Sequence, residues 1–347
     1  MRIGIVTQPL CANYGGILQN YALQQILKKM GHTPITLDYL PSLSFGRYVL
    51  YAGKTLLFAF SPNKRHPLKQ YRHFIKRPAD IEPFINNNFD LTKTIADYSK
   101  RILRKYHIDA IVLGSDQVWR YSYNSHYIDD MFLAFAKHYP CPKIVYGASF
   151  GVDNWDYPQQ ITAEARELIK QFRAISVREK SGISLCRDHL GVEAVNVLDP
   201  TLLLTVADYE VFCKKSAPDE PPYLASYVLD MTEDKAAHIQ TMARDKKLTI
   251  KEMTVSDNGL SIEDWLTTIR NAAFVITDSY HGTLFSILFE KQFQAIINKE
   301  RGGDRFFTVF DNLGIHSLAH IDYPAIQTKL EILRNESLSF LSNALNQ

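Results

Sequence analysis

Hydrophobic and polar positions alternate between two patterns along the first two thirds of the chain. Short, β-branched apolar runs are followed by segments whose apolar residues recur at helical spacing, as in Ile17–Met30, where Gly31 then stands at the expected helix end. The runs that predict strands are Arg2–Thr7, Pro34–Asp38, Ala110–Leu113, Ile144–Ala148, Ala174–Val177 and Val195–Leu198, with helices between them at Ala163–Phe172 and Ser181–His189. Such alternation indicates βαβ units and a mostly parallel sheet.

The same alternation restarts after Ser216–Pro222, a segment with three prolines that reads as a linker. Further strands are predicted at Tyr223–Leu229, Leu248–Thr254, Phe274–Thr277 and Phe293–Ile297, with helices at Thr232–Asp245 and Ile262–Asn271, and from Arg305 and Tyr323 onward. We therefore predict an α/β protein of two Rossmann-like, doubly wound domains that face a central cleft. The expected boundaries are 1–215 and 221–320, followed by a C-terminal helix over 321–347.

Composition agrees with a globular protein of this size. The 347 residues are 46% hydrophobic and 22% charged, which is ordinary for a folded chain that is long enough for two domains. Four widely spaced cysteines without a CxxC pair argue against a zinc site and against a disulfide framework. The chain begins with a strand-like run rather than the apolar region of a signal peptide, so we expect a cytoplasmic protein.

Positive charge is concentrated in one predicted insertion of the first domain, near 42–80. Residues 42–79 contain eight basic side chains and no acidic one, although the net charge of the whole chain is only +2 and predicts no nucleic-acid partner. Phe45–Phe60 within it is largely apolar. The segment is typical of a peripheral contact with the anionic inner face of a membrane, and equally of an amphipathic helical pair with solvated lysines.

Ligands of such sheets bind beyond the carboxyl ends of the strands, so the loops after the first and third strands are informative. The loop after the first strand ends in Asn13, Tyr14, Gly15 and Gly16. Its two glycines precede a helix and permit close backbone approach and anion binding, although a simple tight turn explains them as well. The loop is neither GxGxxG nor a P-loop. After the third strand, Ser115 and Asp116 would suit sugar hydroxyls and Trp119 a sugar ring, unless Trp119 belongs to the core.

Cationic groups follow the strands at 174–177, 274–277 and 293–297. Arg178 could clamp a carboxylate or phosphate, or form a salt bridge with Glu179 or Asp199. Asp278 or Ser279 can cap the next helix, but capping does not explain His281, which can donate to an anion or transfer a proton. Downstream, two arginines flank a glycine pair, either binding a phosphate-bearing ligand or forming a solvated charge run; they are Arg301 and Arg305.

Taken in order, several of these loops resemble the polysaccharide pyruvyl transferase family over about residues 1–315. The matching stretches are Asn13-Tyr-Gly-Gly-Ile-Leu-Gln-Asn-Tyr-Ala-Leu, Gly114-Ser-Asp-Gln-Val-Trp, Tyr146-Gly-Ala-Ser-Phe-Gly, Ser176-Val-Arg-Glu-Lys-Ser, Val197-Leu-Asp-Pro-Thr-Leu-Leu-Leu and Thr277-Asp-Ser-Tyr-His-Gly-Thr-Leu-Phe-Ser. The resemblance implies a glycosyltransferase-B-like fold. It also implies transfer of the pyruvyl group of phosphoenolpyruvate onto two hydroxyls of a sugar, as a cyclic ketal. The acceptor would be a cell-surface polysaccharide, such as a capsule or exopolysaccharide, or its lipid-linked precursor.

Together with the loop patterns above, the resemblance suggests roles for the loop residues. His281 and Asp116 would be catalytic, and phosphoenolpyruvate would be a co-substrate, with no further cofactor and no metal. The donor would contact Arg178, Ser279, His281, Gly282, Arg301 and Arg305, and the acceptor would contact Asn13, Tyr14, Gly15, Gly16, Ser115, Asp116 and Trp119.

One position departs from the family pattern. Family members carry an Arg-x-His motif in the second half, and here Ser279 stands two residues before His281 in place of the arginine. Arg301 or Arg305 would then supply the missing cation. The departure leaves two alternatives open: a nucleotide-sugar-dependent glycosyltransferase of the same fold, and a non-catalytic carbohydrate-binding protein.

Overall fold

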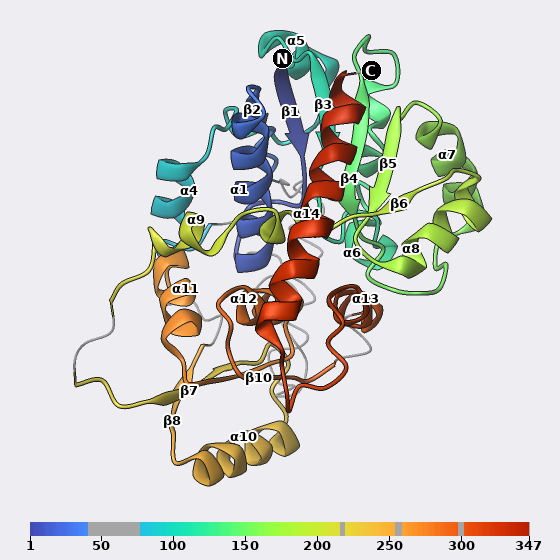
Figure 1. Cartoon of the computed structure of the whole chain (residues 1–347). Helices are drawn as coiled ribbons and strands as arrows, with labels where there is room; N and C mark the ends of the chain where they lie inside the picture. Colours follow the sequence, from blue (N-terminus) through green and yellow to red (C-terminus); the bar gives the residue numbers. More distant parts are fainter. Residues whose placement is uncertain (41–76, 216–218, 254–258, 298–301, 347) are drawn as a thin grey trace, which may run out of the picture.

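The computed structural model consists of two parallel sheets, one above the other in Figure 1, with helices packed around both. It describes residues 1–40, 77–215, 219–253, 259–297 and 302–346. The first sheet has the strand order β2-β1-β3-β4-β5-β6 and the second the order β10-β9-β7-β8. Neighbouring strands are parallel in both sheets, as expected for strands joined by crossover helices.

The elements of the first sheet follow the predicted alternation. Its strands are β1 Arg2–Val6, β2 Thr33–Thr36, β3 Ala110–Leu113, β4 Lys143–Ala148, β5 Ala174–Val177 and β6 Val195–Asn196. The helices along this part of the chain are α1 Tyr14–Lys29, α4 Glu82–Asn88, α5 Lys100–Lys105, α6 Tyr121–Asn124, α7 Gln159–Ile169, α8 Lys180–Leu185 and α9 Val206–Glu210. Short 3-10 turns occur at Asp130–Phe132, Ala134–Ala136 and Pro200–Leu202, and a π-helical turn at Cys186–Leu190.

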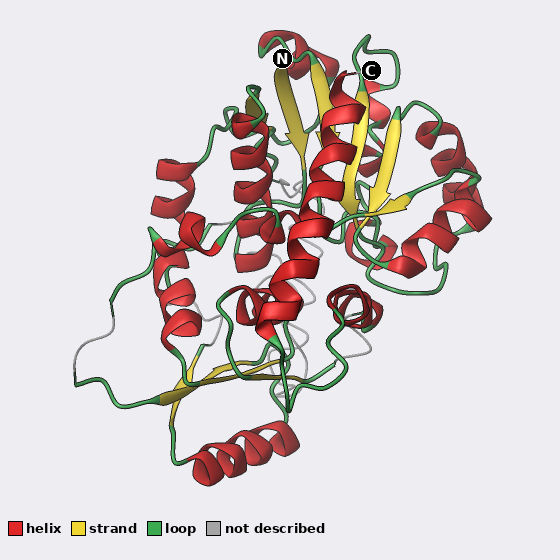
Figure 2. Cartoon of the chain, in the orientation of Figure 1, coloured by secondary structure: helices red, strands yellow, loops and turns green. Residues whose placement is uncertain are grey.

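The second sheet is shorter. It contains β7 Tyr223–Tyr227, β8 Thr249–Glu252, β9 Phe274–Thr277 and β10 Phe293–Ala295, with α10 Glu233–Lys246, α11 Ile262–Asn271, α12 Tyr280–Leu288 and α13 Asp304–Leu313 around it. The last helix, α14 Tyr323–Asn346, starts beside the second sheet and runs back across the first, so that both chain ends lie at the same end of the molecule (Figures 1 and 2).

The central strands β3 and β4 of the first sheet are buried on both faces, which explains their continuous apolar runs. On β3, Val112 belongs to the core facing α1, whereas Ile111 belongs to the core on the opposite face. The core on the α1 side continues into the second sheet, where it includes Tyr227 and Val275. A single hydrophobic core therefore joins the two sheets.

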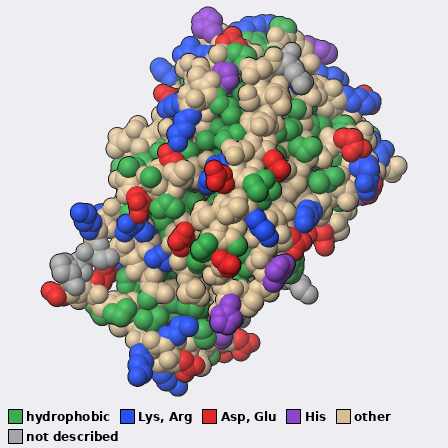
Figure 3. Space-filling model, in the orientation of Figure 1, with side chains coloured by type: hydrophobic (Ala, Val, Ile, Leu, Met, Phe, Trp, Pro, Cys, Tyr) green, Lys and Arg blue, Asp and Glu red, His purple; other side chains and the backbone are tan. Residues whose placement is uncertain are grey.

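The structure confirms the predicted fold class, with a strand at each predicted position. The helices α4, α5 and α6 were not predicted, because they are short and only one or two of their residues are buried. The basic segment lies almost wholly in 41–76, outside the described residues, so the membrane hypothesis stays a prediction. The domain boundaries also stay predictions. Among the described helices, none combines the length and the apolar character that crossing a bilayer requires. The face in Figure 3 mixes acidic and basic side chains.

Candidate functional site

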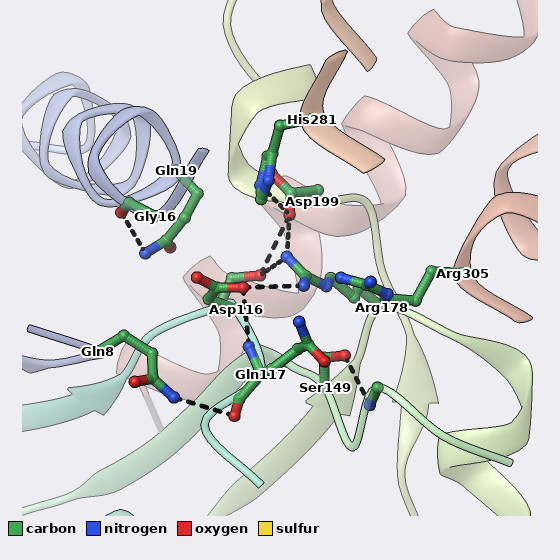
Figure 4. A network of polar contacts seen from close by, with 12 residues as sticks. Gln8, Gly16, Gln19, Asp116, Gln117, Ser149, Arg178, Asp199, His281 and Arg305 are labelled. Atoms are coloured by element: carbon green, nitrogen blue, oxygen red, sulfur yellow. Dashed lines mark hydrogen bonds and ion pairs between the residues drawn. The ribbon is translucent and has the colours of Figure 1, made fainter. Parts of the chain in front are cut away.

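Loops at the carboxyl ends of strands from both sheets meet in one place, drawn in Figure 4. We call this contact the seam; it comprises Asn13–Gly16, Ser115–Gln117, Ser149–Gly151, Arg178–Glu179, Asp199, Ser279–Gly282 and Gly302–Arg305. Four of its ionisable side chains interact directly, and we call them the buried cluster: Asp116, Arg178, Asp199 and His281. No member of the buried cluster is more than 6% exposed.

The seam closes tightly because glycine stands at Gly15. A Cβ atom built there would lie 1.9 Å from Nδ1 of His281, so the start of α1 in the first sheet touches the start of α12 in the second. A second close contact joins Gly302 to Gly151, where an added Cβ would lie 1.9 Å from the carbonyl oxygen of Gly151. The cleft that the sequence predicts is therefore a closed contact in this structure.

His281 occupies its position because of how strand β9 leads into helix α12. The hydroxyl of Thr277 donates to the carbonyl oxygen of Tyr227 at 2.7 Å and accepts from the N–H of Ser279 at 3.0 Å. Ser279 then caps α12 by accepting from the N–H of Gly282 at 3.3 Å. Gly282 lets the helix approach the strand, since a Cβ there would lie 2.4 Å from the Thr277 hydroxyl. His281 thus stands in the first helical turn, at the positive end of the helix dipole.

Arg178 forms the centre of the buried cluster. Its Nη1 lies 2.7 Å from Oδ2 of Asp199 and its Nη2 lies 3.1 Å from Oδ1 of Asp116. The salt-bridge interpretation of Arg178 is therefore the arrangement in the structure, with Asp116 as the partner that the sequence analysis did not foresee. Glu179 instead accepts from the N–H groups of Phe150 and Gly151. Binding of the donor substrate by Arg178 stays a prediction. The Nε atom of Arg178 is buried and makes no hydrogen bond to any described residue, so it could bind that substrate.

The ion pairs dominate the electrostatics of the buried cluster. Burial alone would raise the pKa of Asp116 and of Asp199, but positive neighbours outweigh it and hold both carboxyls below their ordinary pKa. For Asp199 the neighbours are His281 and Arg178. Burial would likewise lower the pKa of Arg178, whereas its two carboxylate partners raise it. Both carboxylates therefore stay ionised, and they can orient donors or accept a proton.

A second arginine lies beside the buried cluster. Arg178 and Arg305 both contact the ring of Tyr280, with Cζ atoms 4.8 and 5.0 Å from its centroid. Burial, together with the nearby Arg178, lowers the pKa of Arg305 to about 10. Burial also raises the pKa of Glu179, whose Oε2 makes no hydrogen bond to a described residue. Two guanidinium groups therefore lie close together at the seam, with Asp116, Asp199 and Glu179 as their acidic neighbours.

The structure places the predicted acceptor residues in two groups. Asn13 donates from its amide to Oδ2 of Asp116 at 2.9 Å, and a Cβ at Gly16 would touch both side chains, so these residues lie together at the seam. Ser115 is also near, donating to the carbonyl oxygen of Gly147 at 2.8 Å, but it is fully buried.

Trp119 and Tyr14 are corrections to the sequence analysis. Trp119 is fully buried, stacks on Phe132 at 5.3 Å and donates to the carbonyl oxygen of Met131, so its indole face belongs to the core and is closed to a sugar. Tyr14 is 1% exposed and stacks on Trp265 from the second sheet. Hydrophobic packing explains both positions, because a large aromatic ring gains stability when it is buried against other rings in the core.

Among the seam residues that were not singled out as site residues from sequence, three have ionisable or aromatic side chains that face Arg178: Asp199, Glu179 and Tyr280. The signal for Asp199 was present, since Val197-Leu-Asp-Pro follows a predicted strand directly. Arg301, one of the two arginines proposed to replace the family arginine, lies outside the described residues, whereas Arg305 reaches the seam.

Structural comparison supports the fold. The chain is similar to a Listeria monocytogenes protein assigned as a UDP-N-acetylglucosamine 2-epimerase, with 11% identity, a TM-score of 0.51, and coverage of 99% of this chain and 91% of that one. It is also similar to a glycosyltransferase from Rickettsia africae, with 12% identity, a TM-score of 0.48, and coverage of 100% and 98%. At these identities the likeness shows the fold alone: two parallel α/β sheets in the glycosyltransferase-B arrangement.

Sequence comparison is informative at the level of the family. Among curated proteins, no sequence matches the chain. The family model described as polysaccharide pyruvyl transferase matches residues 13–300, which include every part of the seam except Gly302–Arg305. This match covers most of the chain. The chain therefore belongs to the polysaccharide pyruvyl transferase family.

Proposed function

We propose that the protein transfers the pyruvyl group of phosphoenolpyruvate onto two hydroxyls of a sugar in a cell-surface polysaccharide or its lipid-linked precursor. The observation that carries the proposal is the position of His281, which lies in the first turn of α12 and within ion-pair distance of Asp199. Family membership supports a transferase acting on a polysaccharide.

The charges at the seam suit this donor. Phosphoenolpyruvate carries a carboxylate and a phosphate, and the seam offers Arg305, Nε of Arg178 and the N-terminus of α12. Arg305 takes the place of the family arginine in this proposal, because its guanidinium lies against Tyr280, the residue between Ser279 and His281. The donor enters when the two sheets separate at the seam, which must open because Arg178, Arg305 and His281 are almost fully buried.

The proposed chemistry uses two members of the buried cluster, His281 and Asp116. His281 delivers a proton to the methylene carbon of phosphoenolpyruvate, so that C2 gains positive charge and a sugar hydroxyl adds to it. Asp116, kept ionised by Arg178, accepts the proton of that hydroxyl. The carbon–oxygen bond to phosphate then breaks, and a second hydroxyl closes the ketal at C2. In the balance, one hydroxyl proton ends on the new methyl group and the other on phosphate.

The test is a calorimetric titration with phosphoenolpyruvate, combined with thermal unfolding. We expect saturable binding by the wild type and a rise in melting temperature, since a ligand at 100 times its Kd stabilises the native state by about 2.7 kcal/mol. His281→Ala should lose this response, and His320→Ala should keep it, because His320 is exposed in the loop between α13 and α14.

Two results would overturn the proposal. One is a wild type that ignores phosphoenolpyruvate but is stabilised by a nucleotide sugar, which would favour the glycosyltransferase alternative that Ser279 leaves open. The other is equal binding of phosphoenolpyruvate by the wild type and His281→Ala, which would place the donor elsewhere.

A further inference from the structure

Asp199 connects the two sheets through a single carboxylate. Its Oδ1 accepts from the N–H of Thr201 at 3.0 Å and from the hydroxyl of the same residue at 2.8 Å, which fixes the carboxylate at the start of a 3-10 turn. Its Oδ2 lies 2.7 Å from Nη1 of Arg178 in the first sheet and 3.6 Å from Nε2 of His281 in the second. The side chain is fully buried, so solvent does not compete for these contacts.

The two nitrogens of the His281 ring have different surroundings. Nε2 faces Asp199 and makes no hydrogen bond to a described residue, so the carboxylate is the nearest acceptor for a proton there. Nδ1 faces the backbone at Gly15, across the seam where the start of α1 meets the start of α12. Asp199 and Gly15 therefore contact different nitrogens of the same ring.

We propose that Asp199 is the positioning residue of the site: it holds a proton on Nε2 of His281 and so makes Nδ1 the atom that exchanges protons. A carboxylate behind an imidazole fixes the tautomer and stabilises the charged ring when the opposite nitrogen is protonated. The contact of 3.6 Å is long for a hydrogen bond, as catalytic contacts commonly are before a ligand binds. That Nδ1 delivers its proton to phosphoenolpyruvate rests on the proposed function.

Asp116 is the natural comparison for Asp199. Both carboxylates pair with Arg178, and both lie near enough to His281 for its charge to lower their pKa. Asp116, however, directs Oδ2 to the amide of Asn13, and only Asp199 lies within ion-pair distance of the imidazole in the described residues. Asp199→Ala and Asp116→Ala each remove one ion pair of Arg178, but Asp199→Ala alone also removes the contact with His281. Comparing the two variants therefore separates the effect of that contact from the effect of losing an ion pair.

The experiment observes the tautomer directly, by nitrogen-15 NMR of the histidine side chains during a titration from about pH 5 to pH 9, across the ordinary range of an imidazole. His281→Gln identifies the resonances by their absence. In the wild type we expect the proton to leave Nδ1 and to remain on Nε2. Asp199→Ala should lose this preference and give a mixture of tautomers, whereas Asp116→Ala should keep the Nε2 proton.

A wild type whose neutral His281 carries its proton on Nδ1 would overturn the proposal, with or without a folded Asp199→Ala variant. Equal tautomer populations in the wild type and Asp199→Ala would overturn it as well. Adding phosphoenolpyruvate to the same samples tests the proposed function separately: we expect the Nδ1 resonance to move. A tautomer that depends on Asp199 but ignores phosphoenolpyruvate would leave the positioning role intact and contradict the donor.

Discussion

Gly15 shows how one absent side chain determines the contact between the two sheets. The residue is the second of α1, where an alanine would ordinarily stabilise the helix by roughly 0.5–1 kcal/mol. A Cβ atom at this position would instead lie 1.9 Å from Nδ1 of His281, well inside van der Waals contact. Helix propensity therefore predicts that alanine at this position stabilises the protein, whereas the steric clash predicts that it destabilises the protein. The distance of 1.9 Å indicates that the clash is the larger effect.

We expect Gly15→Ala to destabilise the protein by about 1–3 kcal/mol, the usual cost of adding a methyl group to a closely packed contact. It should also weaken phosphoenolpyruvate binding, because His281 must turn away from the new Cβ. Urea denaturation and the calorimetric titration measure the two effects.

Gly114→Ala is the matched control, since its new Cβ would have Leu23 as its nearest neighbour, at 3.4 Å, an ordinary contact. A Gly15→Ala protein that is as stable as the wild type, or more so, would contradict a closed seam and show that propensity decides.

Residue identity alone could not reveal which charges would pair at the seam. Arg178 and Asp199 are 21 residues apart, and Arg178 and Asp116 are 62 apart, so only the sheet order brings them together. The sequence analysis did single out Arg178 and His281, because both lie just beyond the carboxyl end of a strand, where ligands of parallel sheets gather. Trp119 follows a strand as well but packs into the core, and the sequence contains no signal that separates these outcomes.

At the scale of elements, α14 connects the second sheet to the loop that carries Asp199. Ser337 in α14 accepts a hydrogen bond of 3.0 Å from the N–H of Leu198, the residue before Asp199. Arg334 donates to the carbonyl oxygens of Leu202 and Leu204 at 2.9 and 3.2 Å. The helix thereby satisfies backbone groups that β6, only two residues long, leaves without strand partners.

Ser337→Ala should lower the free energy of unfolding by about 1–3 kcal/mol, the cost of a buried N–H that loses its acceptor. Ser337 is 3% exposed, so water cannot replace the hydroxyl freely. Urea denaturation measures the change, and Ser339→Ala, on an exposed position of the same helix, should remain within about 0.5 kcal/mol of the wild type. Equal effects of the two substitutions would mean that α14 contributes apolar packing alone.

The elements themselves were mostly predictable, and the exceptions have a physical cause. Runs such as 110–113 and 274–277 are short, apolar and β-prone, and they form buried strands because helices cover both faces of their sheets. Helix α5 was missed because Leu103 is its only buried residue, which leaves no apolar stripe to recognise. The path of α14 back over the first sheet was equally hidden, since it depends on tertiary contacts rather than on local pattern.

At the scale of the whole molecule, the two sheets share an apolar core in addition to the polar contact at the seam. Tyr14 belongs to the first helix of the chain, yet its ring stacks on Trp265 at 5.7 Å and contacts Tyr227 edge-on at 6.2 Å. Its hydroxyl donates to the carbonyl oxygen of Leu260 at 2.7 Å. An apolar contact of this kind couples the folding of the two sheets, in contrast to domains joined by a polar, mobile interface.

We therefore expect the wild type to unfold in a single calorimetric transition, and Tyr14→Ala to unfold in two. Removing the ring should cost about 3–5 kcal/mol, as for other buried aromatic side chains, and the loss falls on the contact between the sheets rather than within either one. Tyr14→Phe keeps the ring and loses only the bond to Leu260, so it should melt in one transition with a smaller loss of about 0.5–1.5 kcal/mol. Two transitions in the wild type itself would contradict a shared core. The seam would then open by independent motion of the sheets, and the contacts of Tyr14 would not couple their unfolding.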